Sequence, residues 1–249
     1  MKILLLLKTV ADSEASIRPT SDGKAVNLSD INFILNPYDE YAVEEALRIR
    51  EKIGEAETIA VCYGDDNAVK TLRTALALGV DRGVHIKGHP TFDALATAKV
   101  LASAVKEMSF DLILCGKQAI DNDNAAVGVM VAELLDIPSI SVVVDLEISD
   151  GKVRAMREIE GGHEVVETKL PCLITAQKGL NEPRYPSLKG IMAAKKKPIE
   201  EKEAAAVETR IEPIQIGLPP ARPSGRIVGE GVEAVPELVR LLKQEAKVI

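Results

Sequence analysis

The run Ile3-Leu4-Leu5-Leu6-Leu7, near the start of the 249-residue chain, decides the fold. This uninterrupted apolar run has the length of a β-strand, and a strand without polar alternation is covered by other elements on both faces. Such strands are typical of parallel sheets. The run could also begin a signal peptide, but it is short and Lys8 follows it. A buried first strand is therefore the better interpretation.

Helix-like and strand-like segments alternate after this run. Tyr38–Ile53 carries apolar residues at helical spacing and ends at Gly54. The later segments are a strand over Thr58–Val61, a helix over Ala68–Leu78, a short strand over Val84–Ile86, a helix from Phe92 to Met108 capped by Thr91, a strand over Asp111–Leu114 and a helix over Asn124–Leu135. Repeated units of this length predict an α/β fold with a doubly wound, mainly parallel sheet.

The pattern changes to consecutive strands after residue 140. Turn signals at Asp150-Gly151 and Gly161-Gly162 separate segments with charged outward positions. We expect an antiparallel meander at one edge of the sheet. Its strands would be Ser141–Ile148, Lys152–Ile159, His163–Leu170 and Cys172–Ala176.

The last part of the chain does not resemble a second domain. Pro219-Pro220 interrupts any regular structure, and a final amphipathic helix covers about Val235–Ala246. We therefore divide the chain into an α/β domain over 1–194, which holds the candidate nucleotide loops described below, and a C-terminal arm with its helix over 195–249. The apolar residues of the arm favour packing on a partner, and a freely moving tail is the alternative.

The composition excludes several classes of function. The formal net charge is −7, aromatic residues make up 3% and Trp is absent, which argues against broad nucleic-acid binding. No segment approaches the ~20 apolar residues that cross a bilayer, so we expect a soluble, cytoplasmic protein without membrane insertion. The cysteines lie far apart and the histidines lack ligand spacing, so we expect no metal site and no catalytic constellation.

The loop Gly116–Gly128 is the best candidate for ligand binding, because ligands of parallel sheets bind beyond the carboxyl ends of the strands. Small residues from Ala125 to Gly128 would let a ligand approach the first turn of the following helix. Free amides and the helix dipole attract a phosphate there, and we expect it against Asn124–Val127. Asp121 and Asp123 would repel a closer phosphate and could instead cap the helix.

The familiar nucleotide motifs are absent. The chain has no GxGxxG after the first strand and no GxxxxGK[ST], which argues against an NAD-binding Rossmann unit and a P-loop enzyme. An enzyme that hydrolyses or transfers an adenylyl group is an alternative from another class. Such enzymes need a Ser/Gly-rich loop after the first strand, whereas this chain has Lys8-Thr9-Val10-Ala11-Asp12.

A second segment, Gly179–Met192, suits a contact with another protein. Ser187 can cap a helix running through Ala194, from which Leu188, Ile191 and Met192 project beside the lysines that follow. An apolar tip rimmed by positive charge is typical of transient interfaces. The alternative is that these apolar residues pack on the domain.

Four blocks carry a resemblance to a known family, in the same order and nearly end to end. They are Asn36–Asp39 with Ala42–Ala46, Gly116–Asp121 with Asp123 and Gly128, Arg157–Gly162 through Leu170-Pro171, and Asn181–Tyr185 with Lys195–Lys197. Together they resemble the β subunits of electron transfer flavoproteins. The resemblance implies an αβ heterodimer, with a redox-active FAD mainly in the α subunit and no bond-making chemistry in β. Electrons would pass from flavin dehydrogenases to a membrane quinone oxidoreductase or another acceptor.

The same resemblance implies a site for AMP and a docking site for dehydrogenases. Leu188 matches the anchoring leucine of the docking site, with Ile191 and Met192 beside it. The implied AMP-binding residues are Leu6, Asn36, Pro37, Tyr38, Asp39, Tyr63, Asp121, Asn122, Asp123, Asn124, Ala125, Ala126, Val127, Gly128, Val129, Met130, Val131 and Ala132.

Some family members carry a second FAD in place of AMP and bifurcate electrons, which is a further alternative. Those members tend to have Gly-Asp-Thr-Ala-Gln-Val-Gly-Pro at the second loop. Here Asn122–Val129 departs from that sequence at several positions, so we favour AMP. Near the α-subunit flavin the family often has aromatic residues from β. Tyr38 fits one such position, but Ser13 stands at the other.

Overall fold

The apolar run at the start of the chain forms β1, Lys2–Leu7, in the interior of a nine-stranded sheet. Its side chains alternate between two hydrophobic cores. Ile3 and Leu5 pack into one core, and Leu4 and Leu6 pack into the other. Because β1 is parallel to both of its neighbours and buried on both faces, the predicted α/β fold is confirmed.

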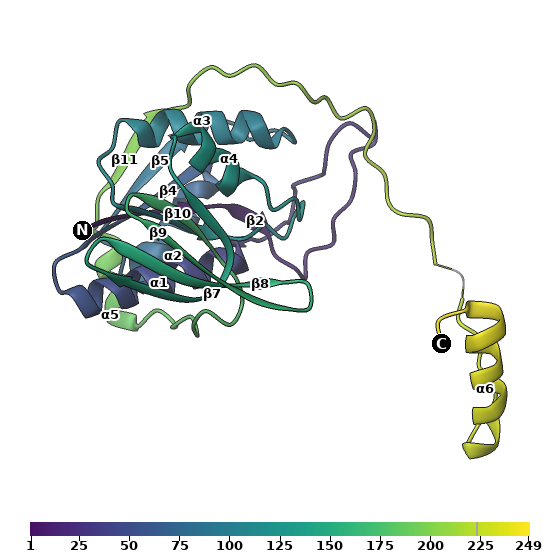
Figure 1. Cartoon of the computed structure of the whole chain (residues 1–249). Coiled ribbons are helices and arrows are strands. Elements are labelled where there is room, and N and C mark those ends of the chain that lie inside the picture. Colours follow the sequence, from purple (N-terminus) through teal and green to yellow (C-terminus); the bar gives the residue numbers. More distant parts are fainter. Residues whose placement is uncertain (223) are drawn as a thin grey trace.

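The computed structural model describes residues 1–222 and 224–249. The order of strands in the large sheet is β11-β5-β4-β1-β6-β10-β7-β8-β9, and β2 pairs with β3 in a small antiparallel sheet (Figure 1). Besides β1, the strands are β2 Thr9–Ala11, β3 Phe33–Leu35, β4 Glu57–Gly64, β5 Arg82–Lys87, β6 Leu112–Gly116, β7 Ser139–Ser149, β8 Lys152–Ile159, β9 Gly162–Lys169, β10 Cys172–Ala176 and β11 Ile199–Glu203.

Helices cover both faces of this sheet. The core on one face is closed by α1, α2 and α5, and the core on the other face by α3 and α4. The helices are α1 Pro37–Ile53, α2 Asn67–Leu78, α3 Ala94–Lys106, α4 Val127–Leu134, α5 Leu188–Ala194 and α6 Val235–Leu241, with a 3₁₀ turn at Val232–Ala234 before α6 and a π-helical turn at Leu242–Ala246 after it.

Two local predictions are corrected. The meander is antiparallel over β7, β8 and β9, but Cys172–Ala176 forms β10, which inserts between β6 and β7 and runs parallel to both. Every residue of β10 is buried, as expected of an interior strand. The cap of α3 is Asp93 rather than Thr91, because the Asp93 carboxylate accepts the amides of Leu95 at 2.9 Å and Ala96 at 3.1 Å.

The C-terminal segment contributes to the sheet before it leaves the body. β11 lies within the range that we assigned to the arm, yet it pairs in parallel with β5 at the sheet edge. Beyond it the chain is extended, and its Arg210 amide donates to Asp93 at 2.7 Å. The predicted terminal helix is present as α6 and the π-helical turn, which lie apart from the body (Figure 1).

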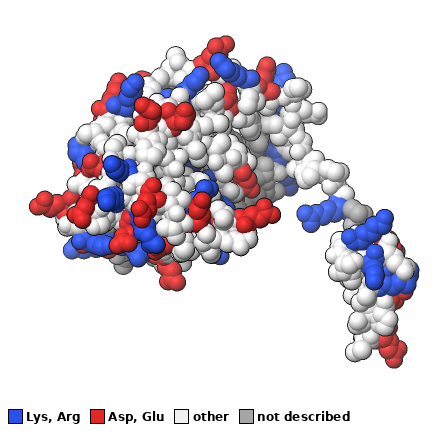
Figure 2. Space-filling view, viewed as in Figure 1, with Lys and Arg blue, Asp and Glu red and all other residues white. Residues whose placement is uncertain are grey.

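The surface of the body and the surface of the arm differ in charge. Basic and acidic side chains are interspersed over the visible face of the body, whereas the extended stretch that leads to the terminal helix shows mostly uncharged side chains, and the terminal helical part again carries charged ones (Figure 2). Ile214 and Ile227 of the arm are 93% and 88% exposed. In residues 1–222 and 224–249, no helix is both long and apolar enough to cross a membrane.

Candidate functional site

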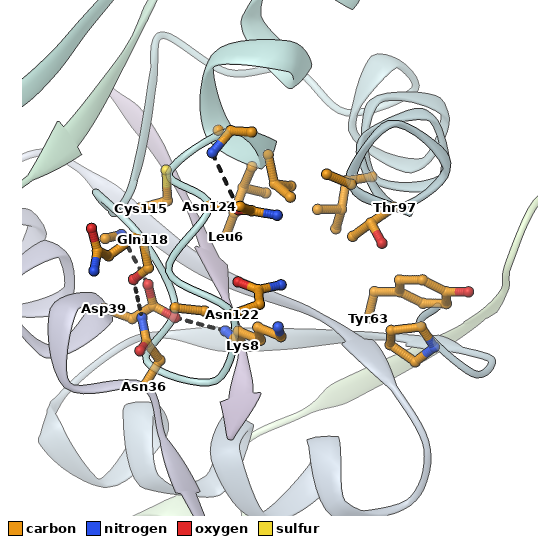
Figure 3. A pocket seen from close by; sticks show the side chains of 18 of the residues that line it. Leu6, Lys8, Asn36, Asp39, Tyr63, Thr97, Cys115, Gln118, Asn122 and Asn124 are labelled. Atoms are coloured by element: carbon orange, nitrogen blue, oxygen red, sulfur yellow. Dashed lines mark hydrogen bonds between the residues drawn. The ribbon is translucent and has the colours of Figure 1, made fainter. Parts of the chain in front are cut away.

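A cleft opens at the carboxyl ends of β1, β4 and β6. The chain leaves β1 towards β4 on one side, and it leaves β6 towards the other half of the sheet. The strand order therefore reverses between β1 and β6, which is the position where open α/β sheets bind ligands. Figure 3 shows Tyr63 and Thr97 on one side of this cleft and Asn36, Asp39 and Gln118 on the other.

About half of the predicted cofactor residues line the cleft. They are Leu6, Asn36, Asp39, Tyr63, Asn122, Asn124, Ala126, Val127 and Gly128. The others lie outside the cleft lining of the described chain, and they are Pro37, Tyr38, Asp121, Asp123, Ala125, Val129, Met130, Val131 and Ala132.

One wall of the cleft was missed by the sequence analysis. The loop after β5 and the start of α3 provide it, through Pro90, Thr91, Phe92, Ala94, Thr97 and Leu101. The rule that ligands bind beyond strand ends would have found this loop, because it follows a predicted strand. The remaining lining residues flank predicted positions, and they are Leu7, Lys8, Cys115, Gly116, Lys117, Gln118 and Ala119.

Asn36 and Asp39 join the loops of the site to one another. The Asn36 side chain donates to the Gln118 carbonyl at 2.9 Å and accepts the Ile120 amide at 3.2 Å. The Asp39 carboxylate accepts the Lys8 amide at 2.7 Å and the Gly116 amide at 2.9 Å. Both side chains are buried, so they act as internal supports that fix the ends of β1 and β6.

Burial dominates the electrostatics of Asp39. It raises the pKa of this carboxyl from 3.8 to about 7, although the amides of Lys8 and Gly116 favour the charged form. Burial likewise raises the pKa of the Cys115 thiol in the cleft wall. A neutral, buried thiol is a poor nucleophile.

Asp121 and Asp123 do not cap the helix, so the alternative suggested by the sequence is wrong. Asp121 pairs with the Lys8 ammonium at 2.6 Å, and Asp123 accepts the Gln118 side chain at 2.6 Å. Lys117 extends over the ring of Tyr38, 5.2 Å from its centroid. These contacts hold the loop in a fixed form and compensate its acidic groups, which lowers their repulsion of an anion.

The helix after this loop begins at Val127 and not at Asn124, which corrects the prediction. Ala125 has a left-handed backbone with φ of 49°, and the Asn124 side chain accepts the Ala126 amide at 3.3 Å. Met130 is the first residue whose amide bonds to the helix start, through Ala126. The amides of Val127 and Gly128, in the first turn of α4, therefore have no hydrogen-bond acceptor within the helix. The expected position of an anion moves from Asn124–Val127 to Val127 and Gly128.

Two glycines let the backbone segments of the site approach closely. A Cβ on Gly116 would lie 2.6 Å from Cβ of Tyr38, at the start of α1. A Cβ on Gly128 would lie 2.7 Å from Sγ of Cys115, on the floor of the cleft. The first turn of α4 can therefore rest directly against the end of β6.

The cleft combines an apolar wall with amide donors. Leu6, Leu101 and Tyr63 offer apolar surface, and the α4 amides offer a place for negative charge. This combination suits a small ligand with a planar apolar part and an anionic part. Within the described residues, no group of three acidic, histidine or cysteine side chains could hold a metal ion.

A second candidate surface lies on α5. The Ser187 hydroxyl accepts the Gly190 amide at 3.0 Å, so the predicted cap is confirmed. Leu188 is 85% exposed and Met192 is 64% exposed, with Ile191 partly exposed beside them. Of the three following lysines, Lys197 turns inward and donates to the carbonyls of Leu76 and Val80, so it is not part of the basic rim.

Comparison with known proteins gives one consistent family. The model of the electron transfer flavoprotein domain matches residues 25–207. The electron transfer flavoprotein subunit beta of Bacillus subtilis is 44% identical over 260 residues, covering 100% of both chains. The corresponding subunit of Syntrophomonas wolfei is 41% identical over 100% of this chain and 98% of its own. A mitochondrial subunit beta of Arabidopsis thaliana is 40% identical over 100% of both.

The close packing at Gly128 predicts a sensitive position. Gly128→Ala should lower the free energy of unfolding by about 1–3 kcal/mol, because Cys115 is buried and cannot move aside freely. Urea unfolding followed by circular dichroism measures this change. Gly162→Ala is the matched control, because no atom lies within 4 Å of its added Cβ. Equal losses in the two variants would contradict the packing argument.

The raised pKa of Asp39 predicts a dependence of stability on pH. The folded chain binds a proton at Asp39 more tightly than the unfolded chain, so this contribution is fully present below about pH 4 and is lost as the pH rises towards 7. The stability of the parent relative to Asp39→Asn should fall over that window, by up to about 1.4 kcal/mol per pH unit. Urea titrations from pH 4 to 8 test this, and parallel profiles would refute it.

Proposed function

The chain belongs to the electron transfer flavoprotein family, as a β subunit, and we propose that it binds AMP as a structural ligand and works only in complex with an α subunit. The α subunit holds the FAD that accepts and passes on electrons. This chain makes and breaks no covalent bond. It closes one wall of the flavin site and presents a surface to the electron donor.

The observation that carries the AMP proposal is the cleft at the reversal between β1 and β6. The amides of Val127 and Gly128 would hold the phosphate, and Leu6, Leu101 and Tyr63 would contact the adenosine part. Asn36 and Asp39 would support the site from behind, since their polar atoms already bond to the loops. In this proposal the nucleotide fills the gap between the two halves of the sheet.

The two alternatives, a second FAD in this chain and an adenylyl-transferring enzyme, have less support. The loop Asn122–Val129 departs from the sequence typical of members with a second FAD. An adenylyl-transferring enzyme would need free donors after β1, but the Lys8 amide bonds to Asp39 and its ammonium pairs with Asp121. Both contacts favour a structural end of β1 rather than a reactive one.

We propose that Leu188 anchors the docking of flavin dehydrogenases, with Ile191 and Met192 beside it. Their exposure on a short, capped helix supports this role, because a partner pocket can cover them without rearranging the core. Electrons then leave the α-subunit FAD to a quinone oxidoreductase or another acceptor. The cytoplasm is the proposed compartment.

The arm over 195–249, beyond its β11 segment, is proposed to pack on the α subunit. Ile211, Ile214, Leu218 and Ile227 are exposed along it, and α6 leaves Val235, Leu238 and Val239 accessible. Apolar residues repeated along an extended chain are typical of a segment that wraps a partner.

The ligand proposal predicts a defined nucleotide content. The purified αβ complex, denatured and analysed by chromatography and absorbance, should release one AMP and one FAD per heterodimer. Release of two FAD and no AMP would support the bifurcating alternative. A complex that assembles with its FAD but without AMP would refute the proposal, and so would turnover of the bound AMP.

The docking proposal predicts a specific effect of Leu188→Ala. With a purified flavin dehydrogenase that reduces the parent αβ complex, the apparent KM for the complex should rise about tenfold or more, because anchors of this kind contribute at least ~1.4 kcal/mol. FAD content and αβ assembly should be unchanged. Leu134→Ala is the matched control, since Leu134 is an exposed leucine of α4 on the other face. Equal KM values for Leu188→Ala and the parent would defeat the proposal.

A further inference from the structure

We propose that Arg184 is a positioning residue that fixes the start of the docking segment, Tyr185–Met192, on α1 and so keeps the segment in the form that a partner recognises. This inference rests on the proposed docking role of Leu188. It adds that the segment is preorganised by an ion pair formed 140 residues away in the sequence, with Glu44 of α1.

The guanidinium of Arg184 forks onto two carboxylates. Its Nε lies 2.7 Å from Oε2 of Glu44 and its Nη2 lies 2.9 Å from Oε1 of the same residue, while Nη1 lies 2.6 Å from Glu51. The backbone amide of Arg184 also donates to Glu44, at 3.2 Å. Bidentate, charge-assisted contacts of this kind fix both the position and the direction of the chain.

Burial makes the pair with Glu44 the dominant contact. The Glu44 side chain is 7% exposed, whereas Glu51 is 53% exposed. A buried carboxylate that loses its only ion pair is strongly unfavourable, whereas an exposed pair contributes little. The two carboxylates raise the pKa of Arg184, which agrees with a permanent charge at this position.

The residues before the docking segment bond to α1 on the side that also holds Arg184. Asn181 donates to the Tyr41 carbonyl and to Glu45, both at 2.9 Å. Arg48 donates to the Leu180 carbonyl at 3.3 Å. Glu44, Arg48 and Glu51 are four and three residues apart, so they lie on one side of α1. From there they bond to Leu180 and Arg184 of the segment that crosses the helix.

The other end of the docking segment is tied to α2 by independent contacts. Arg73 donates to the carbonyls of Ala194 at 2.5 Å and Lys197 at 2.7 Å. Gly190 lies so close to the Ala77 carbonyl that a side chain has no room there. Loss of Arg184 therefore frees the chain between Asn181 and the start of the segment, and it leaves the other end in place.

This arrangement lowers the conformational cost of docking. Between the two ties, Tyr185, Leu188 and Met192 are exposed while the backbone is held, so a partner meets an apolar surface that is already ordered. If freeing one end leaves only a fraction of the molecules in the docking-competent form, the apparent affinity falls to that fraction of its original value. We expect roughly a three- to tenfold rise in KM for Arg184→Ala.

A double-mutant cycle on the αβ complex tests the inference. KM and kcat are measured with a flavin dehydrogenase that reduces the parent complex, for Arg184→Ala, Leu188→Ala and the double variant. We expect Arg184→Ala to raise KM with little change in kcat, and to have no further effect when Leu188 is already Ala. Arg184→Lys should restore part of the affinity, since a lysine keeps the charge but loses the fork.

Further variants separate positioning from direct contact and from a role in folding only. Glu44→Gln should reproduce the effect of Arg184→Ala, because Glu44 is buried and cannot touch a partner. Glu51→Gln should have a smaller effect. Arg154→Ala is the matched control, because it removes an exposed Arg–Glu pair between β8 and β9 and should leave KM unchanged.

The outcomes are distinct. Additive effects of Arg184→Ala and Leu188→Ala would mean that Arg184 contacts the partner on its own, which would overturn the inference. An unchanged KM in Arg184→Ala together with an effect of Leu188→Ala would also overturn it, while the docking proposal would stand. No effect of Leu188→Ala would remove both. Loss of αβ assembly in Arg184→Ala, Arg184→Lys and Glu44→Gln alike would assign these residues to folding alone.

Discussion

The carboxylate of Asp39 connects the parts on which the candidate site depends. It accepts one amide from the end of β1 and another from the end of β6, and these are the two strands between which the sheet reverses its order. Gly116 has no side chain, and this allows α1 to bring the carboxylate so near. The cleft lies beside this link, and the loop that leads from Gly116 to α4 begins at it.

Much of the fold could be predicted because its signals are local. The apolar run of β1, the amphipathic α1 and the cap of α5 by Ser187 each require only neighbouring residues. The position of β10 could not be predicted in this way, since an apolar strand gives no indication of which strands flank it. The start of α4 was misplaced because Asn124 and Ala125 form a turn whose left-handed residue is not a glycine.

The candidate site was predicted in outline, but several of its residues have other tasks than the sequence suggested. Asn36 and Asp39 face inward and bond to backbone, so their residue types reflect the joining of loops as much as any ligand. The wall at Pro90–Ala94 carries no nucleotide motif, and only the topology brings it to the cleft. The pairing of Arg184 with Glu44 joins distant parts of the chain, and no local pattern reveals such a contact.

The place of β11 has a consequence for how the chain can be shortened. The sheet ends on this strand, which is drawn from the C-terminal segment and covers the outer edge of β5. A truncation after residue 194 would remove it and leave unpaired the backbone groups of β5 that face away from β4. Unpaired strand edges can pair with the strands of other chains, and this promotes aggregation. A fragment meant to lack the wrapping segment should therefore retain the residues through Ala204, whose amide bonds to the Lys87 carbonyl at the end of β5.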